Sequence, residues 1–214
     1  MIEFPSIAAT QVTNSASIFG NVNERLFEKL VPGLFPIMIE TKVGDGFVVY
    51  SECVILKNLE GYLTVNGTAL FNMKAAAVSA RGYLSEFIKI YKLNVQEDAH
   101  FLLNFLPPEF VIDGQSGGAA LTCCMLSMLL NIEPRNDIAV IGAISLKGLI
   151  LEVQFGNKLA AAKRCGLMHI VMPERMRKKW DELPAETKEG LTAHFVMYFK
   201  EIFCLVFPGV VLQE

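Results

Sequence analysis

The sequence predicts an α+β fold, in which mixed β-sheets are packed by helices, and three observations support this prediction. Near the N-terminal end, three short segments rich in Ile, Val, Tyr and Phe are separated by turns, as strands are. Strand-like and helix-like segments alternate in the second half, which is typical of mixed α/β architectures. Hydrophobic residues make up 52% of the 214 residues and charged residues 19%, so the chain can bury a large core.

The first half of the chain is predicted to contain a short helix, a meander of three strands, a long amphipathic helix and a further strand. Residues 23–30 place Leu26, Phe27 and Leu30 on one helical face, and Pro32-Gly33 ends that helix. The meander is inferred from the short loops between its strands. In chain order, the three strands, the long helix and the last strand cover residues 34–42, 47–56, 62–66, 68–92 and 100–106.

The second half begins with an apolar helix over residues 118–130. A strand of small and β-branched residues follows at 137–145, and the turn at Lys147-Gly148 pairs it with the next strand. A helix over 157–165 ends at Gly166, which is typical of a glycine C-cap. The other predicted elements are strands at 149–154, 169–172 and 193–197, helices at 174–181 and 198–207, and a turn or short helix at 184–190.

Charge and hydropathy argue against several classes of function. The net charge is −3 and no run of Lys and Arg exceeds the one at residues 175–179, so we expect no nucleic-acid partner. No apolar run reaches the roughly 18 residues that a spanning helix needs, so we expect no membrane partner. The first two dozen residues contain no Lys or Arg, which argues against a secretory signal peptide.

The cysteines and histidines lack the spacing of a metal site. The cysteines form an odd, scattered set, so we expect reduced core residues, no metal and a cytoplasmic or other reducing compartment; they are Cys53, Cys123, Cys124, Cys165 and Cys204. His100, His169 and His194 lie far apart in predicted strands, and we expect structural roles for them. The 214 residues contain no phosphate-loop motif, so no ATPase module and no cofactor is expected here.

A serine between glycines precedes the 118–130 helix. Residues 111–120 read Val-Ile-Asp-Gly-Gln-Ser-Gly-Gly-Ala-Ala, which predicts a sharp turn into a helix N-terminus. The hydroxyl of Ser116 would lie beside backbone N–H groups without helical partners, an arrangement suited to a developing oxyanion. Taken alone, the pattern more often means a serine helix cap. Asp113 is expected to cap this turn or to orient the site.

The second candidate is Lys158, at the start of the 157–165 helix. It is the only charged residue between Glu152 and Lys163, and its neighbours in sequence are largely apolar. Burial among such residues would lower its pKa and give a neutral amine that accepts a proton from serine, as in serine–lysine dyads. The alternative is a solvated lysine at a helix start.

Several segments together resemble the proteolytic domain of the Lon protease family. Residues 113–119, Asp-Gly-Gln-Ser-Gly-Gly-Ala, resemble the family's Asp-Gly-Pro-Ser-Ala-Gly signature. Residues 137–148, which end in Gly-Ala-Ile-Ser-Leu-Lys-Gly, resemble its Met-Thr-Gly-Glu-Ile-Ser-Leu-x-Gly strand. Residues 158–166, Lys-Leu-Ala-Ala-Ala-Lys-Arg-Cys-Gly, resemble its lysine helix, and Ile-Val-Met-Pro-Glu at 170–174 resembles the strand that follows.

The resemblance implies a Lon-like fold over residues 41–214, with residues 1–40 as an N-terminal arm and helix without a clear Lon counterpart. Ser116 would be the nucleophile and Lys158 the general base. The turn that would hold the oxyanion comprises Asp113, Gly114, Gln115 and Gly117.

The sequence departs from the Lon pattern close to these residues. Four residues differ: Gln115 stands for Pro, Gly117 for Ala, Ile141 for Thr and Ala143 for Glu. An ungapped comparison of the helices places Gly156 where Lon has its lysine. Lys158 instead resembles the lysine of the birnavirus polyprotein protease, a compact relative of Lon in which the lysine directly precedes a Leu-Ala-x-Ala helix.

The function implied is an ATP-independent serine endopeptidase that cleaves unfolded or extended polypeptide segments, its own precursor included. The substrate would lie along a strand edge, as in β-strand addition. A homo-oligomer and a separate ATPase partner both stay open. The alternative is a non-catalytic Lon-like domain for interaction or assembly, suggested by Ile141, Ala143 and the displaced lysine. The presence of both Ser116 and Lys158 favours the enzyme.

Overall fold

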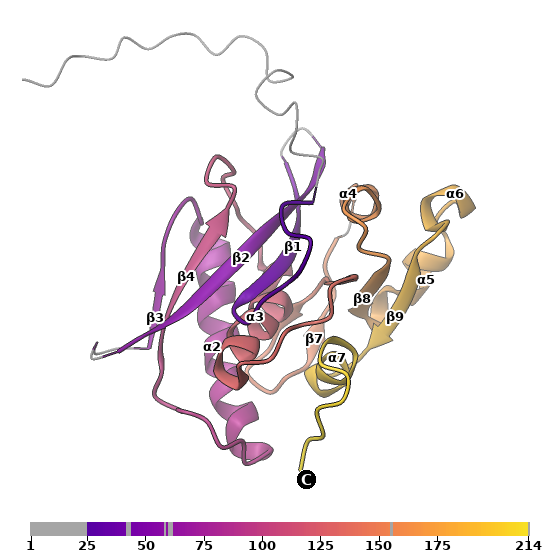
Figure 1. The fold of residues 1–214 in the computed structure, drawn as a ribbon. Helices are drawn as coiled ribbons and strands as arrows, with labels where there is room; N and C mark the ends of the chain where they lie inside the picture. The colour runs from indigo at the N-terminus through magenta and orange to yellow at the C-terminus, as the bar shows by residue number, and fades with distance from the viewer. Residues whose placement is uncertain (1–24, 42–43, 58, 60–61, 155, 214) are drawn as a thin grey trace, which may run out of the picture.

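The computed structural model describes residues 25–41, 44–57, 59, 62–154 and 156–213, and it confirms the predicted α+β fold (Figure 1). The first sheet has four strands in the order β1-β2-β4-β3. Within it, β1 (Leu34–Glu40), β2 (Gly46–Leu56) and β4 (His100–Leu106) are antiparallel neighbours, and β3 (Leu63–Val65) pairs parallel with β4.

Two long helices pack side by side against this sheet (Figure 1). The first, α2 (Phe71–Ile90), joins β3 to β4 and buries one face, which includes Ala77, Leu84 and Phe87. The second, α3 (Gly118–Leu130), is buried on all sides from Gly118 to Ser127, because α2 contacts it as well as β1 and β2. Ser116 lies two residues before the start of this buried helix, so the packing of α3 fixes its position.

The rest of the chain forms a smaller layer around a parallel sheet in the order β5-β8-β9. Its strands are β5 (Ile138–Val140), β8 (His169–Pro173) and β9 (Thr192–Val196), and β6 (Ala143–Ile144) pairs antiparallel with β7 (Ile150–Leu151). Its helices are α4 (Lys158–Arg164), α5 (Arg177–Asp181) after a 3-10 turn at Glu174–Met176, α6 (Ala185–Lys188) and α7 (Phe199–Val206).

An aromatic cluster joins the two layers. Phe199 of α7 packs against Tyr83 and Phe87 of α2, with ring centroids 5.5 Å and 5.4 Å apart, and Phe203 lies 5.5 Å from Phe87. All four side chains are buried. The last helix, α7, is therefore packed against α2, which covers the first sheet.

The prediction of a helix at residues 23–30 is wrong for residues 25–30. Residues 23 and 24 lie outside the part of the chain that the structure describes. Residues 25–30 are irregular because tertiary contacts hold them one by one. Leu30 is buried and its N–H donates to Asn136 Oδ1 at 3.0 Å, and Phe27 packs edge-on against Tyr50. The apolar spacing that suggests a helical face reflects these separate contacts.

Three strand predictions also need correction. The strand at 62–66 does not continue a meander, because α2 brings the chain back so that β3 pairs parallel with β4. The strand predicted at 137–145 is divided into β5 and β6, because the N–H groups of Ile141 and Gly142 donate to Val171 and Ser116 instead of to one partner strand. Its partner at 149–154 is reduced to Ile150–Leu151.

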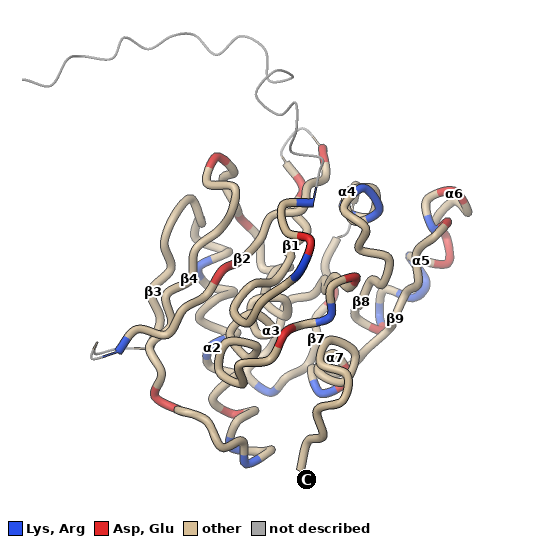
Figure 2. The backbone as a smooth tube through the Cα atoms, viewed as in Figure 1, with Lys and Arg blue, Asp and Glu red and all other residues tan. Residues whose placement is uncertain are grey.

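The N-terminal part of the described chain is integral to the first sheet. All seven residues of β1 pair with β2, so a division at residue 40 would separate two neighbouring strands. Among the described residues, no helix is long and apolar enough to cross a membrane. Basic and acidic residues are interspersed along the described backbone in Figure 2.

Candidate active site

Ser116 lies in a 3-10 turn, Gln115–Gly117, that leads directly into α3. Gly114 precedes the turn with a φ of 105°, a conformation that glycine adopts without strain. The carbonyl of Ser116 accepts the N–H of Gly142 at 2.9 Å, and the N–H of Ala119 donates to the Gly142 carbonyl at 3.0 Å. The turn is therefore held by α3 and by the connection between β5 and β6.

The carboxylate of Asp113 joins this turn to α2. It accepts the backbone N–H groups of Asn72 and Met73 at 2.9 and 3.2 Å, and the side-chain amide of Asn72 at 3.0 Å. These N–H groups lie in the first turn of α2, where a helix has no partners of its own. The bond from the Asn72 side chain, followed by the bond from the Gly114 N–H, lowers the pKa of Asp113. Asp113 thus contacts its own turn and also caps a second helix.

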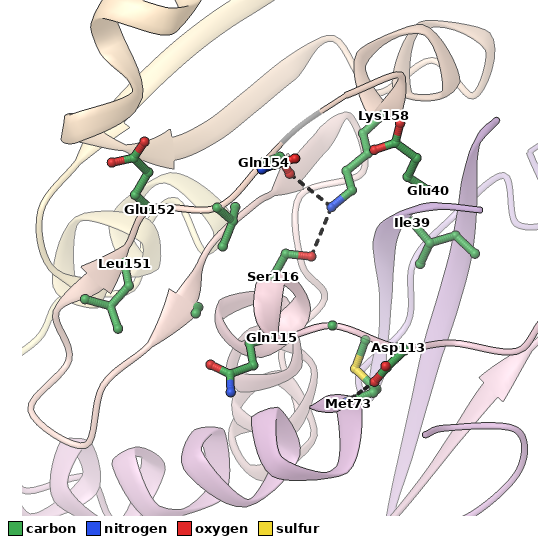
Figure 3. Close-up of a pocket in the computed structure, with 13 residues that line it drawn as sticks. Ile39, Glu40, Met73, Asp113, Gln115, Ser116, Leu151, Glu152, Gln154 and Lys158 are labelled. Atoms are coloured by element: carbon green, nitrogen blue, oxygen red, sulfur yellow. Dashed lines mark hydrogen bonds between the residues drawn. The ribbon is translucent and has the colours of Figure 1, made fainter. Parts of the chain in front are cut away.

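Lys158 is the first residue of α4, and its side chain points into the site (Figure 3). Its Nζ donates to Ser116 Oγ at 3.0 Å and to the carbonyl of Gln154 at 3.3 Å. The residue is only 6% exposed. Burial lowers the pKa of the Lys158 amine, and the nearby carboxylate of Glu40 opposes that effect. Burial has the larger effect, so the neutral amine is reached at lower pH than in a solvated lysine.

Ser116 and Lys158 face an open cavity of about 410 Å³. Ile39, Glu40 and Met73 line one side of it, and the chain from Leu151 to Gln154 lines the other (Figure 3). The cavity also contains Asp113, Gly114, Gln115 and Ala143. It is large enough to admit several atoms of an extended chain next to the serine hydroxyl.

The arrangement can support attack by a serine on a carbonyl group. A neutral Lys158 amine, 3.0 Å from Ser116 Oγ, can accept the hydroxyl proton. The N–H groups of Gln115 and Ser116 begin the 3-10 turn, which offers them no internal partner, so they can stabilise an oxyanion. Among the described residues, no group of three or more His, Cys, Asp and Glu side chains could hold a metal ion.

The structure brings together most, but not all, of the residues selected from the sequence. Ser116, Lys158, Asp113, Gly114 and Gln115 line one cavity. Gly117 lies below it and is buried, where an added Cβ would come within 3.1 Å of Met73 Cε. Its small size serves packing of the turn against α2.

Two of the groups that act on the Lys158 amine, the carboxylate of Glu40 and the carbonyl of Gln154, were not expected from the sequence. Glu40 stands at the end of β1 and Gln154 contributes only its backbone carbonyl, so neither belongs to a motif. Glu40 reaches the site only because β1 and β2 together contact α4. The signal that could have found Glu40 is a charged residue that ends a strand of otherwise buried residues.

The histidines lie away from the cavity. His100 Nε2 is 2.8 Å from Thr64 Oγ1 in the first sheet, and His169 Nδ1 is 2.9 Å from His194 Nε2 between β8 and β9. The last two are therefore neighbours despite their separation in sequence. All five cysteines are free; four are buried as expected, whereas Cys204 is exposed.

Comparison with known proteins gives the same family for nearly the whole chain. The family described as the Lon protease (S16) C-terminal proteolytic domain matches residues 16–208. A mitochondrial Lon protease homolog of Candida dubliniensis is 31% identical over 90% of this chain and 19% of its own length. The Lon protease of Chlamydia trachomatis is 31% identical over 88% of the chain and 23% of its own length, and the peroxisomal Lon protease homolog 2 of Rattus norvegicus is 30% identical over 88% and 22%. The chain thus spans about a fifth of the length of these relatives.

Proposed function

The chain belongs to the family of the Lon protease (S16) C-terminal proteolytic domain, and on this basis we propose that it is a serine endopeptidase with a Ser116–Lys158 dyad. The observation that supports the dyad is the 3.0 Å contact between Lys158 Nζ and Ser116 Oγ at the floor of an open cavity. Burial lowers the pKa of the Lys158 amine, so the neutral form that a base requires is reached at lower pH than in a solvated lysine.

In the proposed reaction, Ser116 Oγ attacks the carbonyl carbon of a peptide bond while Lys158 Nζ takes the hydroxyl proton. The backbone N–H groups of Gln115 and Ser116 stabilise the tetrahedral oxyanion. The C–N bond then breaks and Lys158 gives its proton to the leaving amine, which leaves an acyl ester on Ser116. Lys158 then takes a proton from a water molecule, which attacks the ester carbonyl. The bond between the acyl carbon and Ser116 Oγ breaks, the new C-terminal carboxyl group leaves, and Lys158 returns the proton to Ser116 Oγ.

The substrate proposed is a polypeptide segment that is already extended. The open cavity has room for such a segment between the Ile39–Glu40 end of β1 and the chain from Leu151 to Gln154. The hydrolysis itself consumes no ATP, since water is the only co-reactant. Cleavage of folded proteins is proposed to require a separate ATPase partner. Exposed linkers and the protein's own precursor are further substrates of the same kind.

The proposal is tested by incubating the chain with a mixture of unfolded proteins without nucleotide and identifying new termini by mass spectrometry. We expect cleavage by the wild type, and a loss of about a thousandfold or more in Ser116→Ala. Ser79→Ala, on α2, is the matched control and should cleave as the wild type does. Equal cleavage by Ser116→Ala would contradict the assignment. If the wild type binds unfolded chains and produces no new termini, the function is that of a non-catalytic interaction domain.

A further inference from the structure

The start of α4 is held by the hairpin that β1 and β2 form. The backbone N–H of Asn157 faces Glu40 Oε1 at 3.5 Å, and its side-chain amide donates to the Gly44 carbonyl at 2.5 Å. Arg164, at the other end of α4, donates to the Gly46 carbonyl at 2.8 Å. A Cβ at Gly46 would lie 2.2 Å from the carbonyl oxygen of Asn157, so only glycine permits this approach. These contacts hold Asn157, which directly precedes Lys158.

Glu40 is therefore placed to act on Lys158 through the backbone. A Cβ at Gly156 would lie 2.1 Å from Glu40 Oε2, so the carboxylate is packed against the loop before α4. Figure 3 shows the carboxylate beside the stem of Lys158, whose Nζ turns towards Ser116. A displacement of Asn157 would move the origin of the lysine side chain and lengthen the contact of 3.0 Å to the serine.

Glu40 also differs from the other acidic residues that line the cavity. Glu152 is paired with Lys179 at 2.5 Å, and Asp113 caps α2. Glu40 takes part in none of the ion pairs found among the described residues. Its negative charge favours the cationic form of Lys158, against the effect of burial. The cationic form cannot act as a base.

We propose that Glu40 is a positioning residue of the dyad, which fixes the first turn of α4 through Asn157 and whose charge restrains the activity of Lys158 at neutral pH. This inference rests on the proposed peptidase function. The Glu40 side chain then has two effects on catalysis, one through its contact and one through its charge. The contact with the loop before α4 supports catalysis at every pH, whereas the charge opposes catalysis only where Lys158 is still protonated.

The test is the pH dependence of kcat/KM for two variants and a control. Glu40→Gln keeps an oxygen that can accept the backbone N–H of Asn157 but removes the charge. The part of the pH profile in which kcat/KM rises, here called the limb, should therefore move to lower pH. Glu40→Ala removes both, so the limb should move in the same direction and the plateau should fall about tenfold. Asp45→Asn removes an exposed charge in the same hairpin and should leave the limb in place.

A limb that stays in place in Glu40→Gln, or moves to higher pH, would overturn the proposal. A purely structural role would lower the plateau in both variants without moving the limb. A second measurement does not depend on activity: the lysine Cε resonances are titrated by NMR and that of Lys158 is assigned by its loss in Lys158→Met. Glu40→Gln should lower the Lys158 midpoint, and an unchanged midpoint would overturn the inference. If this midpoint shifts and no Ser116-dependent cleavage is found, the proposed function fails and the effect of Glu40 on Lys158 stands.

Discussion

Lys158 is the residue on which the proposed chemistry depends. Its ammonium form is disfavoured because the residue is only 6% exposed. Its Nζ contacts the hydroxyl of Ser116 and the carbonyl of Gln154. A buried amine of this kind can lose its proton to solvent and then take the proton of the serine. The same geometry with a permanently charged side chain would position the serine without activating it.

Lys158→Arg should therefore be almost as damaging as Lys158→Ala. Arginine stays protonated at any working pH and cannot serve as a base, so kcat/KM should fall about a thousandfold in both variants. The measurement is peptide hydrolysis, with Lys163→Arg in the same helix as the control, since that lysine does not line the cavity and its Nζ donates to the Glu186 carbonyl. An arginine variant with most of the wild-type rate would show that Lys158 is not the base.

The activity should rise with pH through a single ionisation. Burial lowers the pKa of Lys158, and the active form is the neutral one, so kcat/KM increases as the pH passes through that pKa and is lost below it. His100, His169 and His194 do not line the cavity, so their Gln variants should give the same profile from about pH 6 to 10. Disappearance of the limb in one of these variants would mean that a histidine is the base.

At the scale of elements, the turn at Gln115–Gly117 depends on the N-terminus of α2. Asp113 caps that helix, and Met73 of its first turn packs beneath Gly117. Removing the cap should loosen both the helix start and the serine turn, because one carboxylate holds the two together. The resulting misplacement of the nucleophile would lower catalysis without removing a catalytic group.

Asp113→Ala should lower both the Tm and kcat/KM, the latter about tenfold. Asp113→Asn retains an oxygen that can accept the N–H groups of Asn72 and Met73. Its Tm and its kcat/KM should therefore fall less than those of Asp113→Ala. Thermal unfolding and peptide hydrolysis measure the two effects on the same samples. Full activity in the alanine variant would mean that α3 and Gly142 alone fix the turn.

The elements that could be predicted from sequence are those whose own residues determine them. The apolar residues of α3 specify a buried helix, and the glycines around Ser116 specify a turn before it. Residues 25–30 could not be predicted, because contacts with Asn136 and Tyr50 replace local preference. The place of β3 depends on the return path of α2, which loop lengths do not reveal. Glu40 could not be predicted as a site residue for a similar reason, since it reaches Lys158 only through the packing of the β1–β2 hairpin on α4.

At the scale of the whole molecule, the two layers depend on the aromatic contacts between α7 and α2. Phe199→Ala should lower the free energy of unfolding by about 3–5 kcal/mol, because a fully buried ring is replaced by a cavity. Phe71→Ala is the control: its side chain is 82% exposed, and the change should stay within about 0.5 kcal/mol. Urea unfolding measures both. A small effect at Phe199 would show that the layers are held elsewhere.

The most direct test of the dyad is covalent labelling with a fluorophosphonate, followed by intact mass measurement and peptide mapping. Such probes react with serines that an adjacent base activates. We predict one label per chain, on Ser116, no label in Lys158→Met, and wild-type labelling in the control Lys163→Met. A label on another residue, or a wild-type rate of labelling in Lys158→Met, would contradict a Ser116–Lys158 dyad.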